Sequence, residues 1–463
     1  MAANAVRSSP YWHWQPQRDT TESSPRRLTK DKPRMQHRKL TPALTRFVTS
    51  PARRIVMRQV AELRRRIARQ PHAIHYFHRV DDPYCQLMLQ ALPELQHRFD
   101  VTLIPHVIEQ LQPQMYPAPD LLSAYSAIDA KRLARLYRLP FPQIVPGATS
   151  GEREKASRAL VARTRSPRFF AEALDIGTAF WSGASVADSA HPARDTSALR
   201  AGEALLEKLG HYASATVFYG GEWYWGLDRL DHLERRLLGL GLGKNPNESV
   251  HYDRTWRGLF EPVGEPIARQ TPLEYFFSAR SPYSYLGFFQ AQKFAAAHGL
   301  DLELKPVLPM VMRGMAVPQA KRIYILTDSK REAEKFGLEF GRIVDPLGPG
   351  IERAYAVAHW AHAAGQSEAF FASLLPAIAA EAIDVASDSG LRKVVARAGL
   401  DWRSATQALA GKRWRDWVTG HRSEMTELGL WGVPCLKYGD TVAWGQDRFW
   451  VIREALTDGP APS

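Results

Sequence analysis

The chain has 463 residues but only two cysteines, Cys85 and Cys435. Two cysteines cannot build the disulfide framework of a small secreted domain, and no C-x-x-C pair is present to carry a redox disulfide. We therefore expect a protein of a reducing, cytoplasmic compartment. A chain of this length predicts two or three domains.

Long apolar runs are also missing. No stretch is apolar over enough residues to span a bilayer. The N-terminus has arginines but no apolar segment behind them, so a secretory signal is not expected. These absences favour a soluble, globular protein.

Acidic residues are scarce at the N-terminus. Residues 1–72 contain 17 Lys and Arg against 4 Asp and Glu, whereas the rest of the chain contains 44 of each. The net charge of +13 therefore belongs to an N-terminal arm and not to the body. Residues 1–40 are polar and rich in Pro, Ser and Arg, so we expect disorder there, followed by an amphipathic helix to about residue 69.

This helix carries one apolar stripe with arginines around it. Val56, Val60, Leu63 and Ile67 follow the spacing i, i+4, i+7, i+11. The favoured interpretation is a helix that docks on the body through the stripe and exposes its basic face. The alternative is that the basic arm contacts an anionic surface, lipid or nucleic acid.

Two units follow, at residues 73–245 and 271–458. Each is expected to run strand, helix, strand, helical insertion, β-hairpin and closing helix. The expected strands lie at 74–78, 101–105, 215–219 and 222–225 in the first unit, and at 273–278, 302–307, 435–438 and 441–444 in the second.

The two units also match in sequence. Asp82-Pro-Tyr-Cys85 matches Ser281-Pro-Tyr-Ser284 at an offset of 199, and residues 125–132 match 324–331 at the same offset. Residues 219–229 match 438–448 at an offset of 219. The predicted fold class is therefore α/β, with two tandem thioredoxin-like domains that each hold a helical insertion.

The start of the second unit contains the clearest candidate site. Ser281 occupies the N-cap of a helix, and Pro282 occupies its first position. The simplest interpretation is a helix cap and nothing more. A thioredoxin-type fold would place the first C-x-x-C cysteine here, and the helix dipole would favour a bound anion or thiolate.

The second unit resembles DsbA-like proteins, in the branch of 2-hydroxychromene-2-carboxylate isomerases and kappa-class glutathione transferases. Four motifs carry the resemblance. They are Phe276…Ser281-Pro-Tyr-Ser-Tyr-Leu, Lys321-Arg-Ile-Tyr with Asp328, Gly432-Val-Pro, and Trp444-Gly-Gln-Asp-Arg.

The resemblance implies a glutathione site. It implies that Ser281 faces the glutathione sulfur and stabilises the thiolate, and that Val433 and Pro434 form a cis-proline edge for the glutathione backbone. It also implies that Lys321 binds the glycine carboxylate, and that Asp447 with Gln446 binds the γ-glutamyl amine. No metal site is implied.

Two features limit the resemblance. Residues 310–315 lack an Asn that relatives often carry, which leaves the second substrate open. In the first unit Asp82, Leu122 and Ala215 stand where the second has Ser281, Lys321 and Pro434. We expect that unit to be a degenerate copy with an inert Cys85 and a trans Ser214–Ala215 bond, and Cys435 to be a buried strand residue.

The sequence thus predicts a glutathione-dependent isomerase or transferase that acts on a small aromatic or unsaturated acid. A non-catalytic binding or scaffold protein is the first alternative. A thiol-disulfide oxidoreductase is the second, and the absence of C-x-x-C argues against it.

Overall fold

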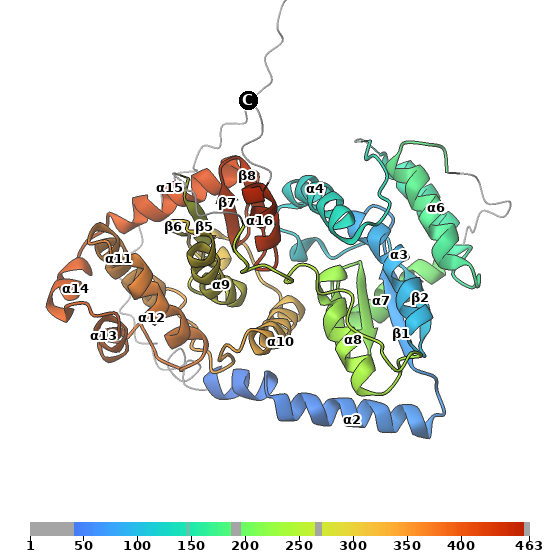
Figure 1. Cartoon of the computed structure of the whole chain (residues 1–463), viewed down its shortest axis with the longest axis horizontal. Helices are drawn as coiled ribbons and strands as arrows, with labels where there is room; N and C mark the ends of the chain where they lie inside the picture. Colours follow the sequence, from blue (N-terminus) through green and yellow to red (C-terminus); the bar gives the residue numbers. More distant parts are fainter. Residues whose placement is uncertain (1–40, 146–147, 187–195, 264–270, 458–463) are drawn as a thin grey trace, which may run out of the picture.

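The computed structural model describes residues 41–145, 148–186, 196–263 and 271–457 (Figure 1). The disorder expected for residues 1–40 lies outside this range, as do residues 264–270 of the linker.

The first unit is built on a four-stranded sheet of order β2-β1-β3-β4. The central strand β1 is parallel to β2 and antiparallel to β3, and β3 forms a hairpin with β4. The hairpin turns at Gly220 and Gly221, whose φ angles of 48° and 88° favour glycine. The strands are β1 Ala73–His78, β2 Thr102–Val107, β3 Thr216–Tyr219 and β4 Glu222–Trp225.

Helices cover this sheet and fill the insertion between β2 and β3. Helix α3 connects the two parallel strands, and α8 closes the unit after the hairpin. The helices are α3 Pro83–Arg98, α4 Pro119–Tyr137, α5 Ser150–Val161, α6 Phe169–Trp181, α7 Ser197–Lys208 and α8 Leu230–Gly239, with short 3-10 turns η1 Pro113–Met115 and η2 Leu227–Arg229.

The second unit repeats the arrangement with a sheet of order β6-β5-β7-β8. Its central strand β5 pairs parallel to β6 and antiparallel to β7. All five residues of β5 are buried, as expected for a strand covered on both faces. The strands are β5 Leu273–Phe277, β6 Leu302–Pro306, β7 Cys435–Tyr438 and β8 Thr441–Trp444.

The insertion of the second unit is larger than that of the first. Its first α-helix begins at Gln319, so Lys321 lies in a first helical turn. The second unit contains α9 Pro282–His298, η3 Met310–Arg313, α10 Gln319–Lys335, α11 Pro349–Ala363, α12 Ser367–Ala379, α13 Asp388–Arg397, α14 Trp402–Ala408, α15 Trp414–Glu427 and α16 Phe449–Thr457. Both sheets therefore confirm the predicted order of elements.

Individual contacts repeat at the offset of 199. The Tyr76 hydroxyl donates to the carbonyl of Cys85 at 3.2 Å, and the Tyr275 hydroxyl donates to the carbonyl of Ser284 at 2.8 Å. Each bond joins the central strand to the first turn of the following helix. The two halves thus use the same contact to fix this helix on its sheet.

Helix α2, Pro51–Ile67, runs along the lower edge of the molecule below α8 and α10 (Figure 1). It is attached to both units by ion pairs. Arg58 Nε lies 2.7 Å from Glu222 of the first unit, and Arg54 Nη2 lies 2.6 Å from Glu334 of the second. The side of α2 that carries Arg54 and Arg58 therefore faces the body.

The prediction that α2 docks through its apolar stripe is wrong. No residue of α2 is buried, and the stripe is exposed by 54% at Val56, 36% at Val60, 58% at Leu63 and 75% at Ile67. The physical reason is that the body presents carboxylates to α2, and these bind arginines in preference to apolar groups. None of the described helices has the length and apolar character needed to cross a bilayer.

Candidate functional site

Ser281 caps α9 as predicted. Its Oγ accepts from the backbone N–H of Ser284 at 3.2 Å, and Pro282 occupies the first helical turn. The hydroxyl hydrogen is not used in this bond, because the oxygen acts as the acceptor. Ser281 can therefore donate a hydrogen bond to an anion at the helix N-terminus, where the helix dipole adds to the attraction.

The second serine of the motif has a structural role. Ser284 is fully buried, and its Oγ accepts from the backbone N–H of Ser278 at 3.2 Å. In the first unit the N–H of Arg79 donates to Cys85 Sγ at 3.3 Å in the corresponding place. The serine and the cysteine therefore satisfy the same backbone group.

The Val433–Pro434 peptide bond is cis, as predicted, and the Ser214–Ala215 bond is trans. The register pairs Phe276 with Cys435, so Val433–Pro434 lies at the end of β5 that leads to Ser281.

Cys435 next to this bond is fully buried, and its thiol donates to the carbonyl of Gly432 at 2.8 Å. Burial raises the pKa of Cys435 well above its usual value. This cysteine is therefore a poor nucleophile, in keeping with the prediction of a buried strand residue.

Lys321 contacts the first unit. Its Nζ donates to the carbonyl of Met115 at 2.8 Å and lies 5.7 Å from the ring centre of Tyr212. Burial lowers the pKa of Lys321 to about 8. The ammonium that the resemblance assigns to a glutathione carboxylate is thus held between the two units.

Gln446 and Asp447 are also held by protein groups. The Gln446 amide donates to Glu332 at 2.9 Å and accepts from Gln290 at 3.1 Å. The carboxylate of Asp447 accepts from Arg229 of the first unit at 2.8 Å. Both side chains are mostly buried, at 2% exposed for Gln446 and 13% for the side chain of Asp447.

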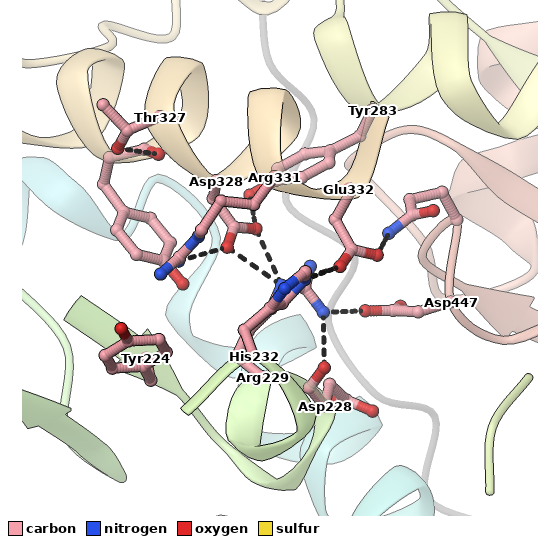
Figure 2. A network of polar contacts seen from close by, with 12 residues as sticks. Tyr224, Asp228, Arg229, His232, Tyr283, Thr327, Asp328, Arg331, Glu332 and Asp447 are labelled. Carbon is pink, nitrogen blue, oxygen red and sulfur yellow. Dashed lines mark hydrogen bonds and ion pairs between the residues drawn. The ribbon is translucent and has the colours of Figure 1, made fainter. Parts of the chain in front are cut away.

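Arg229 is the centre of a buried network between the units (Figure 2). It donates to Asp328 at 2.8 and 3.0 Å and to Asp447 at 2.8 Å. Asp328 also accepts from Arg331 and from the Tyr283 hydroxyl. Burial alone would raise the pKa of Asp328, but Arg229 and Arg331 hold it below its usual value.

Arg448 makes the reciprocal contacts from the second unit to the first. It donates to Asp129 at 2.8 and 2.9 Å and to both oxygens of Asp228 at 2.8 Å. The Tyr84 hydroxyl donates to Asp129 at 2.8 Å, as Tyr283 does to Asp328. Burial raises the pKa of Asp228 to about 6 despite the opposing effect of Arg448. The motif aspartates and arginines of both units therefore form their common interface.

The corresponding site of the first unit is filled by its own side chains. Asp82 caps α3 by accepting from the N–H of Tyr84 at 3.0 Å, and it accepts from the Ser214 hydroxyl at 2.6 Å. Burial raises the pKa of Asp82, and burial with the charge of Asp82 raises the pKa of Cys85 well above its usual value. These contacts agree with an inert Cys85.

Arg313 is a candidate that the sequence analysis missed. Its Nη1 donates to the carbonyl of Trp431 at 3.1 Å, while Nε and Nη2 are buried without a partner among the described residues. Burial and the charge of Arg422 lower the pKa of Arg313 to about 10. The available signal was a lone arginine in the apolar run at 310–315, which follows the expected strand at 302–307.

The segments that carry Ser281, Arg313 and Val433 all adjoin the same end of the second sheet. The parallel register pairs Phe277 with Pro306, so the segments that follow β5 and β6 leave the sheet at the same end. Ser281 follows β5, Arg313 follows β6, and Val433 precedes β7. The end of β5 is fixed by Tyr355, whose hydroxyl accepts from the N–H of Ala279 at 3.0 Å.

A cavity of about 540 Å³ lies elsewhere, between α2, the turn at Gly220–Gly221 and α10. It is lined by residues of both units and of α2, and Ser281 is not among them. This cavity is therefore separate from the end of the second sheet where Ser281 lies.

Comparison with known proteins concerns the second unit. The family model of the DSBA-like thioredoxin domain matches residues 272–457. The chain is 22% identical over 194 residues to 2-hydroxychromene-2-carboxylate isomerase of Sphingobium xenophagum, which covers 40% of this chain and 98% of that protein. It is also 22% identical over 192 residues to the enzyme of the same name from Pseudomonas putida, covering 40% of this chain and 93% of that protein.

Two solved structures match part of the chain at low identity. A structure of 2-hydroxychromene-2-carboxylate isomerase matches with a TM-score of 0.36 and 22% identity, over 40% of this chain and 94% of that one. The cytosolic disulfide reductase DsbM from Pseudomonas aeruginosa matches with a TM-score of 0.31 and 20% identity, over 41% of this chain and all of that one.

Proposed function

We propose that the second unit is a glutathione-dependent isomerase or transferase that acts on a small aromatic or unsaturated acid. The model reaction is that of 2-hydroxychromene-2-carboxylate isomerase, with a kappa-class type of transfer as the variant. The observation that carries the proposal is the Ser281 hydroxyl, which caps α9 and keeps its hydrogen for an anion. Glutathione would supply a nucleophilic thiolate.

The sulfur end of glutathione fits the residues present. Ser281 and the N-terminus of α9 favour a thiolate over a thiol, because both stabilise negative charge. The cis Val433–Pro434 bond lies at the same end of β5, and its backbone would pair with the peptide backbone of glutathione.

The charged ends of glutathione do not fit the residues that the resemblance assigned. Lys321, Gln446 and Asp447 already satisfy groups of the protein in and beside the interface between units. Freeing Gln446 or Asp447 would remove a hydrogen bond from buried Glu332 or Arg229, which is costly. We therefore assign them to the interface and derive no step of the reaction from them.

Arg313 supports an acidic substrate. A buried guanidinium with two unpartnered nitrogens is stabilised by an anion, and a carboxylate matches its geometry. Arg313 follows β6 at the edge where Ser281 follows β5. We propose that it binds the carboxylate of the substrate while Ser281 faces the thiol.

Tandem duplication with loss of the first site is part of the proposal. The repeated strand order, the two sequence offsets and the paired contacts at Cys85 and Ser284 support it. In the first unit Asp82 and Ser214 bind each other where the second unit would hold a thiol. One glutathione per chain is expected.

The test uses two variants of Ser281 on the full chain. Ser281→Ala removes the cap and the donor, whereas Ser281→Asp keeps a good cap and places a negative charge against the thiolate. Conversion of 2-hydroxychromene-2-carboxylate, followed by absorbance with and without glutathione, should fall about 100-fold in both variants. The melting temperature should fall only in Ser281→Ala.

Calorimetric titration with glutathione completes the test. Activity that survives in Ser281→Asp, or two equivalent glutathione sites per chain, would refute the assignment. A matched variant is Asp82→Asn in the first unit, which should change neither activity nor glutathione binding.

A non-catalytic binding protein is the second candidate. It is favoured by the engagement of Lys321, Gln446 and Asp447 at the interface. The absence of glutathione affinity in the full chain would favour this candidate. An oxidoreductase has less support, because both C-x-x-C positions are serines and the two cysteines of the chain are buried.

A further inference from the structure

The N-terminal helical segment presents its apolar side chains to the outside. Fourteen large apolar side chains are exposed in the described part of the chain, and eight of them lie between residues 44 and 67. A concentration of this kind on a short segment marks an interaction surface, since single exposed apolar residues are scattered in ordinary proteins.

Residues 41–48 form a short helix that docks through threonines. Thr45 and Thr49 are buried, and the Thr45 hydroxyl accepts from the N–H of Ile343 at 3.2 Å. Leu44 and Phe47 are both 62% exposed. The polar side of this helix therefore binds the body, and the apolar side faces outward.

Helix α2 is arranged in the same sense. At about 100° per residue, Val56, Val60, Leu63 and Ile67 fall within roughly 60° of the helix circumference. Arg54 and Arg58, which bind Glu334 and Glu222, lie on the opposite side. Since both helices use polar contacts for docking, the apolar face is free over the whole segment.

Positive charge flanks the apolar face. Residues 41–72 contain eight arginines and a single acidic residue, Glu62, which is paired with Arg65 and Arg66. Arg64, Arg66 and Arg69 are exposed, and the side chain of Arg66 is 72% exposed. The partner of this face must therefore be apolar and negatively charged.

We propose that this segment binds an anionic lipid surface. Leu44, Phe47 and the apolar stripe of α2 would insert at the lipid interface, and the exposed arginines would bind the negatively charged headgroups. The apolar face extends over two helices separated by a break at Thr49–Ser50, which a flat surface can accept and a single straight partner helix cannot. A second copy packed in parallel would place Arg64 and Arg66 against the same arginines of its partner, so like charges would meet.

The test is flotation of the full chain with vesicles of phosphatidylcholine alone and with 30% phosphatidylglycerol. Binding is expected only with the anionic lipid, and it should weaken at least tenfold in the Val60→Glu/Leu63→Glu variant. The matched control is Ile128→Glu, at a side chain that is 54% exposed on α4. This control should bind as the parent does.

A second measurement reports the depth of insertion. A polarity-sensitive dye attached to Leu63→Cys should shift to the blue on the anionic vesicles, whereas the same dye on Ile128→Cys should not. Cys85 and Cys435 are buried at 1% and 0% exposure, so labelling is directed to the introduced thiol.

Three results would overturn the proposal. The first is equal binding of the full chain to both vesicle types. The second is no binding to either vesicle type together with no shift of the dye. The third is that the chain instead self-associates or binds an acidic helical peptide, and that Val60→Glu/Leu63→Glu abolishes this interaction. High salt should reduce binding, because it screens the arginines.

Discussion

Replacing Arg448 by Met tests the interface between the two units. The change removes a guanidinium that makes four contacts of 2.8–2.9 Å with Asp129 and Asp228. Asp129 is 1% exposed and would keep only the hydroxyls of Tyr84 and Tyr125. Leaving such charges unpaired should lower the free energy of unfolding by about 3–5 kcal/mol.

Arg229→Met is the matched comparison from the other unit. Here Asp328 keeps Arg331 at 2.8 Å, and Asp447 keeps Arg448 at 3.2 Å. Each carboxylate retains a cation, so the expected loss is about 2 kcal/mol, the value of a charged hydrogen bond. Arg448→Met should therefore be the more destabilising of the two, although the positions correspond in sequence.

Urea unfolding followed by tryptophan fluorescence and circular dichroism measures both losses. The cost of Arg448→Met should shrink as the pH falls from 8 to 5.5. Burial already raises the folded pKa of Asp228 to about 6, and the loss of Arg448, which opposes this shift, raises it further. The protonated form therefore favours the folded state, and the cost of the unpaired carboxylate grows as the pH rises from the unfolded pKa to the folded pKa.

A triple variant serves as the control for this reasoning. Arg448→Met with Asp129→Asn and Asp228→Asn removes the charges together and should recover most of the stability. Equal losses for Arg229→Met and Arg448→Met, or no recovery in the triple variant, would show that the network does not hold the units together.

Three further predictions concern other buried or catalytic groups. His78 and His211 are buried, and burial lowers the pKa of each to about 3. Below pH 6.5 the unfolded chain binds a proton at each histidine and the folded chain does not. At pH 5 each histidine should therefore lower the free energy of unfolding by about 2 kcal/mol. The urea midpoints of unfolding at pH 7 and pH 5 measure this loss. His78→Phe should halve it, and the second unit already has a phenylalanine, Phe277, at the matching position. Lys321→Met should change the free energy of unfolding by less than about 1 kcal/mol, because the relief of a buried charge offsets the lost bond to Met115; a loss of several kcal/mol would contradict this. Arg313→Gln should raise KM for an acidic substrate at least tenfold with little effect on kcat, and an unchanged KM in steady-state kinetics would remove Arg313 from the substrate site.

The sequence by itself determined the order of the elements in both units. Short strands rich in aromatic and β-branched residues, the Gly220–Gly221 turn and the Ser281–Pro282 helix start depend on local backbone preferences, and these operate within a few residues. The matching offsets extended each local assignment to the other unit. The cis bond at Val433–Pro434 was predicted from the resemblance of the Gly432-Val-Pro motif to DsbA-like proteins, and the structure confirms it.

Only the tertiary structure decided the partners of the charged residues. Asp447 and Lys321 suit a glutathione site as isolated side chains, but Arg229 and Met115 bind them from a unit that lies more than 200 residues away in sequence. The stripe of α2 shows the same limit. Periodicity identifies which side of a helix is apolar, whereas the side that faces the body depends on the carboxylates that the body presents, and their placement is a property of the folded chain.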